Sequence, residues 1–144
     1  MIQGVKISKL KIISDDRGKI MHMMRSDSAV FKKFGEIYFS TIYKDVIKGW
    51  HLHLESTLNY ACIKGKVKLV LFDDREKSNT KNQFQEINLS SEDYFLVTIP
   101  PKIWNGFKGI GTNESIIANC LDNPHNEKEM VRRDPSDKYF NYNW

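Results

Sequence analysis

Short runs of alternating apolar and polar residues recur along the chain, separated by turn signals at close spacing. The run Gln83-Phe-Gln-Glu-Ile-Asn-Leu89 has the two-residue period of a half-buried strand. Lys64-Gly65 predicts a tight hairpin turn, and Asp15-Asp16-Arg17-Gly18 predicts another turn. The pattern predicts strands over Val5–Ile13, Lys19–Met24, Gly35–Tyr43, Val46–His53, Leu58–Lys64, Lys66–Phe72, Gln83–Leu89, Tyr94–Ile99, Trp104–Gly109 and Glu114–Leu121.

Helix signals are weak by comparison. Ser26–Phe34 predicts a helical turn or two after Asp27, and Glu127–Arg133 predicts another. Many short strands without a long helix favour an all-β protein of one domain over residues 1–144, folded as a small closed barrel. Barrels of this kind bind ligands in their mouth or interior.

Composition narrows the function classes. Hydrophobic residues make up 40% of the chain, which is typical of a globular protein, but runs such as Lys68–Phe72 are too short to span a bilayer. The first residues carry no signal-peptide pattern, so we expect a cytoplasmic protein without a membrane partner. The net charge of +4 is scattered, which argues against nucleic-acid binding and suits a small anionic ligand such as a diphosphate, or simply a solvated surface. Cys62 and Cys120 lie in apolar runs and are expected to be buried, inert thiols.

The candidate chemistry centres on His51 and His53, which stand two apart and so face the same side of a strand. A lone strand histidine is usually structural, but two on one face beside Lys48 favour a pocket. A metal needs three or four ligands, and no third ligand follows at a suitable spacing, so we expect neither metal nor cofactor. His51 is then suited to general base chemistry, and Asp134 is a candidate carboxylate to orient it. Taken alone, Asp134-Pro135 would simply predict a turn.

Five motifs in order resemble the dTDP-4-dehydrorhamnose 3,5-epimerase family, metal-free sugar-nucleotide epimerases with a cupin-type jelly roll. Asp16-Arg17-Gly18 is similar to the family's D-x-R-G, and Ile47-Lys48-Gly49-Trp50-His51 to its V-L-R-G-L-H. The remaining matches are Asp74-Arg75 with Ser78 and Thr80, Ile99-Pro100 through Asn105-Gly106-Phe107, and Asp134-Pro135 with Trp144. The resemblance covers nearly the whole chain.

The resemblance implies a reaction and roles for individual residues. His51 would take a proton from the carbon beside a 4-keto group, supported by Asp134. Lys48, in place of the family's arginine, would stabilise the enolate. Arg17 and Arg75 would hold the diphosphate, or else be ion pairs that tie turns together. The other expected substrate-binding residues are His53, Tyr38, Asn59, Asn105 and His22.

The chain also departs from the family pattern. His125 stands where the family has its catalytic tyrosine and is the candidate catalytic residue that would return a proton to carbon. Asn105 replaces the histidine of a later motif. His22 occupies the position of an acidic residue that contacts the thymine base, and Leu58 that of a lysine. These departures leave the general acid and the nucleotide contacts open.

Two other functions compete with epimerisation at C3 or C5. The run Gly49-Trp-His51-Leu-His53 is similar to the R-G-x-H-A-H of the sugar-nucleotide 3,4-ketoisomerases, and a non-catalytic sugar-binding cupin is a third reading. By resemblance to the epimerases we expect a homodimer that binds a nucleotide-diphosphate sugar. The apolar run Ile20–Met24 would then lie in the interface or pocket, or else in ordinary core.

Overall fold

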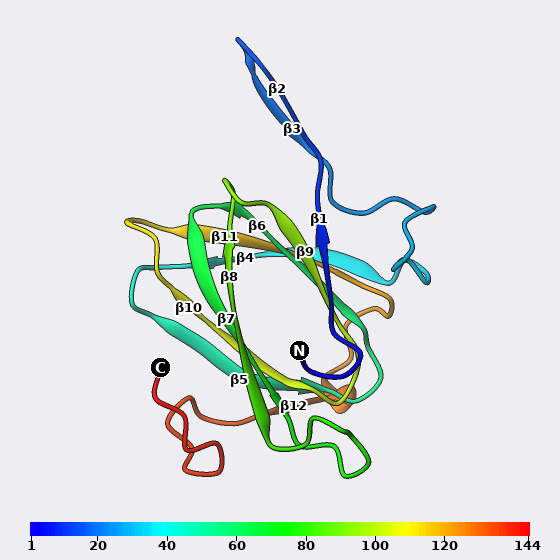
Figure 1. Cartoon of the computed structure of the whole chain (residues 1–144), viewed down its shortest axis with the longest axis vertical. Coiled ribbons are helices and arrows are strands. Elements are labelled where there is room, and N and C mark those ends of the chain that lie inside the picture. The colour runs from blue at the N-terminus through cyan, green and yellow to red at the C-terminus, as the bar shows by residue number, and fades with distance from the viewer.

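The alternating runs of the sequence fold into two antiparallel sheets and a separate hairpin (Figure 1). The computed structural model describes residues 1–144. The elements in chain order are β1 (Lys6–Lys9), β2 (Ile12–Asp15), β3 (Gly18–Met21), β4 (Glu36–Ile42), β5 (Ile47–His53), β6 (Leu58–Lys64), β7 (Lys66–Asp73), β8 (Gln83–Ser90), β9 (Phe95–Ile99), β10 (Trp104–Gly109), β11 (Ser115–Leu121), the 3-10 turn η1 (Glu127–Glu129) and β12 (Met130–Arg132).

Each large sheet has five strands. One has the order β1-β9-β6-β11-β4, and the other has the order β12-β5-β10-β7-β8. Their facing side chains form a core of 16 buried residues drawn from both sheets, including Leu69 and Leu71 of β7 and Val97 and Ile99 of β9. Alternate residues of each strand reach this core because successive side chains point to opposite faces. The structure confirms the predicted all-β jelly roll.

The outer face of the second sheet is covered by the end of the chain. Trp50 of β5 is fully buried there, stacked on Phe140 with ring centroids 4.4 Å apart. Tyr142 and Trp144 pack against the same cluster. We call residues 135–144 the C-terminal strap, because they hold the outside of the strand that carries both candidate histidines.

The β2–β3 hairpin projects away from the two sheets as an arm (Figure 1). The prediction of a single strand over Val5–Ile13 is therefore wrong, because β1 pairs with β9 whereas β2 leaves the sheet to pair with β3. Met21, Met23 and Met24 at the base of the arm pack against Tyr94 and its cluster. The core reading of that run therefore holds for these methionines, while Ile20 stays 62% exposed.

Of the remaining local predictions, the hairpin turn is confirmed, whereas the two helical segments are mostly not helical. Gly65 adopts a φ of +74° in the predicted hairpin turn between β6 and β7. Ser26–Phe34 forms turns and no helix. Glu127–Arg133 is helical only over η1, because Met130 onward extends to pair with β5. The chain has no helix with the length and apolar character needed to cross a membrane.

Candidate active site between the two sheets

A cavity of about 260 Å³ opens between the two sheets at the inner face of β5. One wall comes from β5 and β12, and the other from β4, β6 and β11. The lining residues are Tyr38, His51, His53, Tyr60, Leu121, His125, Met130 and Arg132. The structure thus places the predicted pair, His51 and His53, in the lining of one pocket.

Strand alternation explains why both histidines face the cavity. Trp50 and Leu52 point outward into the cluster beneath the C-terminal strap, so His51 and His53 point inward. β12 pairs with β5 in a register that sets Arg132 opposite His51 and Met130 opposite His53. The pocket wall is thus built from two hydrogen-bonded strands that are distant in sequence.

His51 is held in its neutral form. Burial lowers its pKa below the ordinary value of 6.5, and the nearby positive charges of Arg132, His53 and Lys48 lower it further. A neutral imidazole can accept a proton, which is the property a general base requires.

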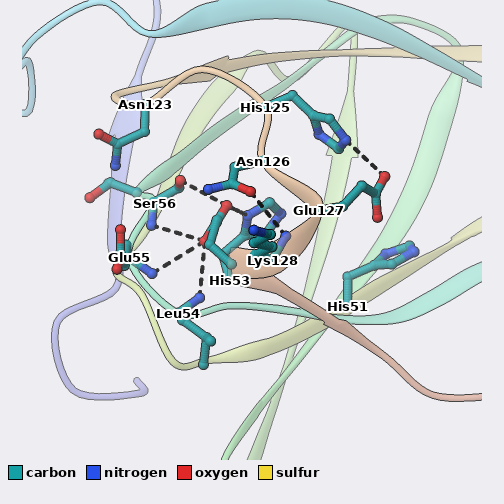
Figure 2. Close-up of polar contacts among 12 residues, drawn as sticks. His51, His53, Leu54, Glu55, Ser56, Asn123, His125, Asn126, Glu127 and Lys128 are labelled. Atoms are coloured by element: carbon teal, nitrogen blue, oxygen red, sulfur yellow. Dashed lines mark hydrogen bonds and ion pairs between the residues drawn. The ribbon is translucent and has the colours of Figure 1, made fainter.

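His53 is anchored by a carboxylate that sequence reasoning missed. Its Nδ1 lies 2.6 Å from Oε1 of Glu129, and both side chains are buried. The Glu129 carboxylate also accepts hydrogen bonds from the Ser56 hydroxyl at 2.9 Å and from the backbone of Leu54 at 3.1 Å and Glu55 at 3.2 Å (Figure 2). Burial opposes ionisation of Glu129, but the bonds from His53 and Ser56 outweigh it and lower its pKa.

Two phenols stand on the opposite wall. Tyr38 comes from β4 and Tyr60 from β6, both in the sheet that faces β5. Burial, together with the contact with Tyr38, raises the pKa of Tyr60 well above 10, so this phenol keeps its proton. The Tyr38 hydroxyl accepts a hydrogen bond from the Asn119 amide at 3.0 Å.

The mouth of the pocket carries a charged cluster. His125 Nε2 lies 2.8 Å from a Glu127 carboxylate oxygen, and Arg132 contacts the same carboxylate at 2.7 Å. Figure 2 shows the ring of His125 turned toward Glu127. His125 is half exposed, and so it reaches the rim of the cavity.

Asp134 does not meet His51, which corrects the predicted pair. Its carboxylate instead accepts hydrogen bonds from the backbone and hydroxyl of Ser136, at 2.8 Å and 2.5 Å, and it is exposed. These bonds also lower the pKa of Asp134. The local turn captures the carboxylate, as the simple turn reading of Asp134-Pro135 predicts. The histidine–carboxylate pair of this pocket is His53–Glu129.

Lys48 lies beside the pocket and does not line it. Its Nζ donates to the carbonyl oxygen of Thr41 at 2.6 Å and to the Ser40 hydroxyl at 3.1 Å, which bridges β5 to β4. Its charge adds a small contribution to burial and to the nearer charges that lower the pKa of His51.

The two predicted phosphate arginines lie outside this pocket within one chain. Arg75 forms an ion pair with buried Asp73 at 2.8 Å and donates to the carbonyl of Gln3 at 2.7 Å. Arg17 is at the tip of the arm, 86% exposed and paired with Asp15. Within a single chain, both arginines therefore form ion pairs, which is the alternative role given for them above. His22 follows the arm and borders a separate shallow hollow with Lys9 and Arg25.

Asn59 and Asn105 are buried ties rather than pocket residues. Asn105 accepts from the Tyr60 hydroxyl at 3.2 Å and donates to the His51 carbonyl at 3.1 Å, so it links the two walls through one side chain. Asn59 donates to the Cys120 carbonyl at 2.9 Å and accepts from Thr98 at 2.7 Å. Neither asparagine is among the residues that line the cavity.

Cys62 and Cys120 are free, buried thiols, as predicted. Burial raises the pKa of Cys62 to about 11, which keeps it unreactive. No group of three histidine, cysteine, aspartate or glutamate side chains is placed to hold a metal ion.

Comparisons with known proteins identify the family. The family model described as dTDP-4-dehydrorhamnose 3,5-epimerase matches residues 1–144. The chain belongs to the dTDP-4-dehydrorhamnose 3,5-epimerase family. It is 32% identical to a probable low-salt glycan biosynthesis epimerase of Haloferax volcanii over 85% of the chain and 80% of that protein. It is 30% identical to the spore coat polysaccharide biosynthesis protein SpsL of Bacillus subtilis over 100% of the chain and 97% of that protein.

Among solved structures, a dTDP sugar isomerase of Desulfovibrio desulfuricans is 35% identical, with a TM-score of 0.97 over 99% of this chain and 92% of that one. The family is one of sugar-nucleotide isomerases, and the predicted family, fold and enzyme class are confirmed. Glu129, Tyr60 and Arg132 are the site residues that the sequence alone did not single out. Glu129 sits in a run of charged residues that resembles ordinary surface, so nothing local signals its burial.

Proposed function

We propose that this protein epimerises a nucleotide-linked 4-keto sugar at C3, C5 or both, for the synthesis of a surface glycan. The observation that carries the proposal is the division of the pocket between the two sheets. The imidazoles of His51 and His53 stand on one wall, and the phenols of Tyr38 and Tyr60 stand on the other. A sugar ring between them would meet a base on one face and proton donors on the opposite face.

The chemistry follows from this arrangement. A keto group acidifies the neighbouring C–H, and neutral His51 takes that proton while the C–H electron pair moves into an enolate. Arg132 and the phenol hydroxyls supply positive charge and donors for the enolate oxygen. The Tyr38 phenol then returns a proton to the other face of the carbon, which inverts the centre, because the Tyr60 hydroxyl already donates to Asn105. Tyr38 replaces the missing family tyrosine in this proposal, because His125 lies at the rim and is bonded to Glu127.

The substrate class is supported by the family and by charge. The matched family model is named for a dTDP-linked sugar, and the two curated relatives are named for glycan and polysaccharide synthesis. Arg132 is the arginine that lines the cavity of a single chain, and its positive charge suits an anionic ligand.

The test is deuterium exchange with solvent. The wild type, incubated in D₂O with dTDP-linked 4-keto-6-deoxy sugars, is expected to place deuterium at C3 or C5, visible by proton NMR. His51→Asn is expected to lower the exchange rate by a factor of about 10²–10⁴, the usual contribution of a general base. Calorimetry with dTDP checks that this variant still binds the nucleotide. If no 4-keto nucleotide sugar exchanges with the wild type, the proposal is wrong and the non-catalytic reading gains.

The presence of His53 in the same pocket favours a second candidate, the 3,4-ketoisomerase. That reaction moves protons between neighbouring positions through an enediol, which two histidines on one wall can serve. A 3-keto product in the NMR spectrum would identify it, whereas an epimerase returns a 4-keto product.

A further inference from the structure

We infer that Glu129 fixes His53 as a second base on the wall that carries His51, so that the pocket removes protons from two positions of one bound sugar. This inference deepens the proposed function and rests on it. Its basis is the hydrogen bonding of a carboxylate that no motif of the family match contains.

The Glu129 carboxylate is surrounded by donors. Oε1 faces His53 Nδ1 at 2.6 Å and the Ser56 hydroxyl at 2.9 Å. Oε2 accepts from the backbone N–H groups of Leu54 at 3.1 Å and Glu55 at 3.2 Å, with that of Ser56 at 3.5 Å. The dashed lines from these backbone nitrogens converge in Figure 2. Such a set of donors requires an ionised, acceptor-only carboxylate.

An ionised partner decides the tautomer of His53. Because Glu129 can only accept, Nδ1 of His53 must carry the proton of the 2.6 Å bond. When the ring is neutral, it therefore presents Nε2 as a bare acceptor. Nε2 makes no hydrogen bond within the chain and is not among the buried unpartnered atoms, while the residue itself lines the cavity. A fixed ring with an open Nε2 toward a pocket is the arrangement of a general base.

Strand geometry limits which atoms of the bound sugar a second base can reach. His51 and His53 are two residues apart on β5, so their side chains stand on the same wall, roughly 7 Å apart at about 3.3 Å per residue. Two bases on one wall approach the same face of a sugar ring at different atoms, and they do not flank one carbon. His53 therefore acts at a second carbon of the ring, where it takes the C–H proton and leaves the electron pair in an enolate. After its proton has exchanged with solvent, it returns a solvent-derived proton to that carbon.

Glu129→Gln is the sharpest test because it preserves shape. The backbone donors of Leu54 and Glu55 require an oxygen at the Oε2 side, which turns the amide nitrogen toward His53. The amide then donates to Nδ1, moves the ring proton to Nε2 and removes the acceptor from the pocket. Glu55→Gln is the matched control, since Glu55 is an exposed neighbour whose side chain makes no hydrogen bond.

Two measurements follow. In ¹H–¹⁵N spectra of histidine-labelled protein, His53 is expected as the Nδ1–H tautomer in the wild type and in Glu55→Gln, and as Nε2–H in Glu129→Gln. In D₂O, the wild type is expected to exchange two positions of a dTDP-linked 4-keto-6-deoxy sugar. Glu129→Gln and His53→Asn are expected to lose one of them by a factor of about 10²–10⁴ and to keep the other within about threefold. If Glu129→Gln does not fold, His53→Asn and the wild-type tautomer carry the test.

The outcomes separate this inference from the proposed function. Exchange that His51→Asn abolishes, but that Glu129→Gln and His53→Asn leave intact at every position, overturns the inference and leaves the proposed function standing. An Nε2–H tautomer in the wild type also overturns it, whatever the exchange shows. A wild type that exchanges nothing overturns the proposed function, and the role of His53 as a base falls with it.

Discussion

At the scale of single residues, the site depends on how charge is distributed around two histidines. His51 has no carboxylate partner and is surrounded by cations, so it stays neutral and available as a base. His53 has a buried carboxylate partner in η1, directly before the strand that pairs with β5, and this contact fixes its orientation. The same strand therefore carries one histidine tuned by positive charge and one tuned by a hydrogen bond.

The positive charge of Arg132 gives a pH prediction. Because the pKa of His51 is lowered in the folded protein, the loss of activity that follows protonation of His51 is expected below pH 6.5. Protonation of His51 also destabilises the folded protein, and it does so only as the pH falls through that range. Arg132→Met removes one cause of the lowering, so the His51 pKa is expected to rise toward 6.5.

NMR titration of the His51 ring proton checks this shift without depending on activity. Lys128→Met, an exposed neighbour on η1, is the control and is expected to leave the titration in place. A midpoint that falls in Arg132→Met would contradict the charge argument.

At the scale of elements, β5 is held from both sides. On its inner side, Asn105 links the His51 carbonyl to the Tyr60 hydroxyl of the facing sheet. The outer face of β5 is covered by the C-terminal strap. Gly49 and Gly106 make the seat for Trp144, because a Cβ on Gly106 would lie 2.8 Å from the Trp144 ring and 3.1 Å from the Cα of Gly49. Small residues on adjacent strands thus let the last side chain of the sequence pack over the active strand.

The strap gives a stability prediction. Phe140 is 3% exposed, stacks on Trp50 and contacts Trp104 edge to face. Phe140→Ala is therefore expected to lower the free energy of unfolding by about 3–5 kcal/mol. Urea denaturation measures the change. Lys138→Ala, an exposed substitution in the same strap, is the control and is expected to stay within about 0.5 kcal/mol of wild type. Equal losses in both variants would mean that the strap does not act through its aromatic contacts.

At the scale of the whole molecule, the apolar side chains of the arm are not covered by the rest of the chain. Ile13 is 45% exposed and Ile20 is 62% exposed on a hairpin that projects from the body (Figure 1). Arg17 at its tip borders a separate hollow on the arm and does not line the cavity of its own chain. An arm of this kind is suited to a second copy of the chain, in line with the expected homodimer.

We therefore predict a dimer in which the arm completes the neighbouring site. Sedimentation at micromolar concentration is expected to show two chains, and Ile13→Asp with Ile20→Asp is expected to shift the protein to one. Arg17→Ala is expected to raise KM for the nucleotide sugar severalfold with a smaller change in kcat. Lys19→Ala, also exposed on the arm, serves as the control. A wild type that sediments as one chain would contradict this assembly.

The two kinds of information divide along physical lines. Periodicity placed most strands within a residue or two, as in β5 to β8, because side-chain alternation is a local property of the chain. The same alternation put His51 and His53 on one face, and the motif order led to the family. The fate of single carboxylates was decided by tertiary structure. Asp134 is captured by Ser136 two residues away, while Glu129, in a run that resembles surface, is drawn beneath β5 by strand pairing. Which charges meet depends on distances between segments far apart in sequence, and those distances exist only once the two sheets have packed.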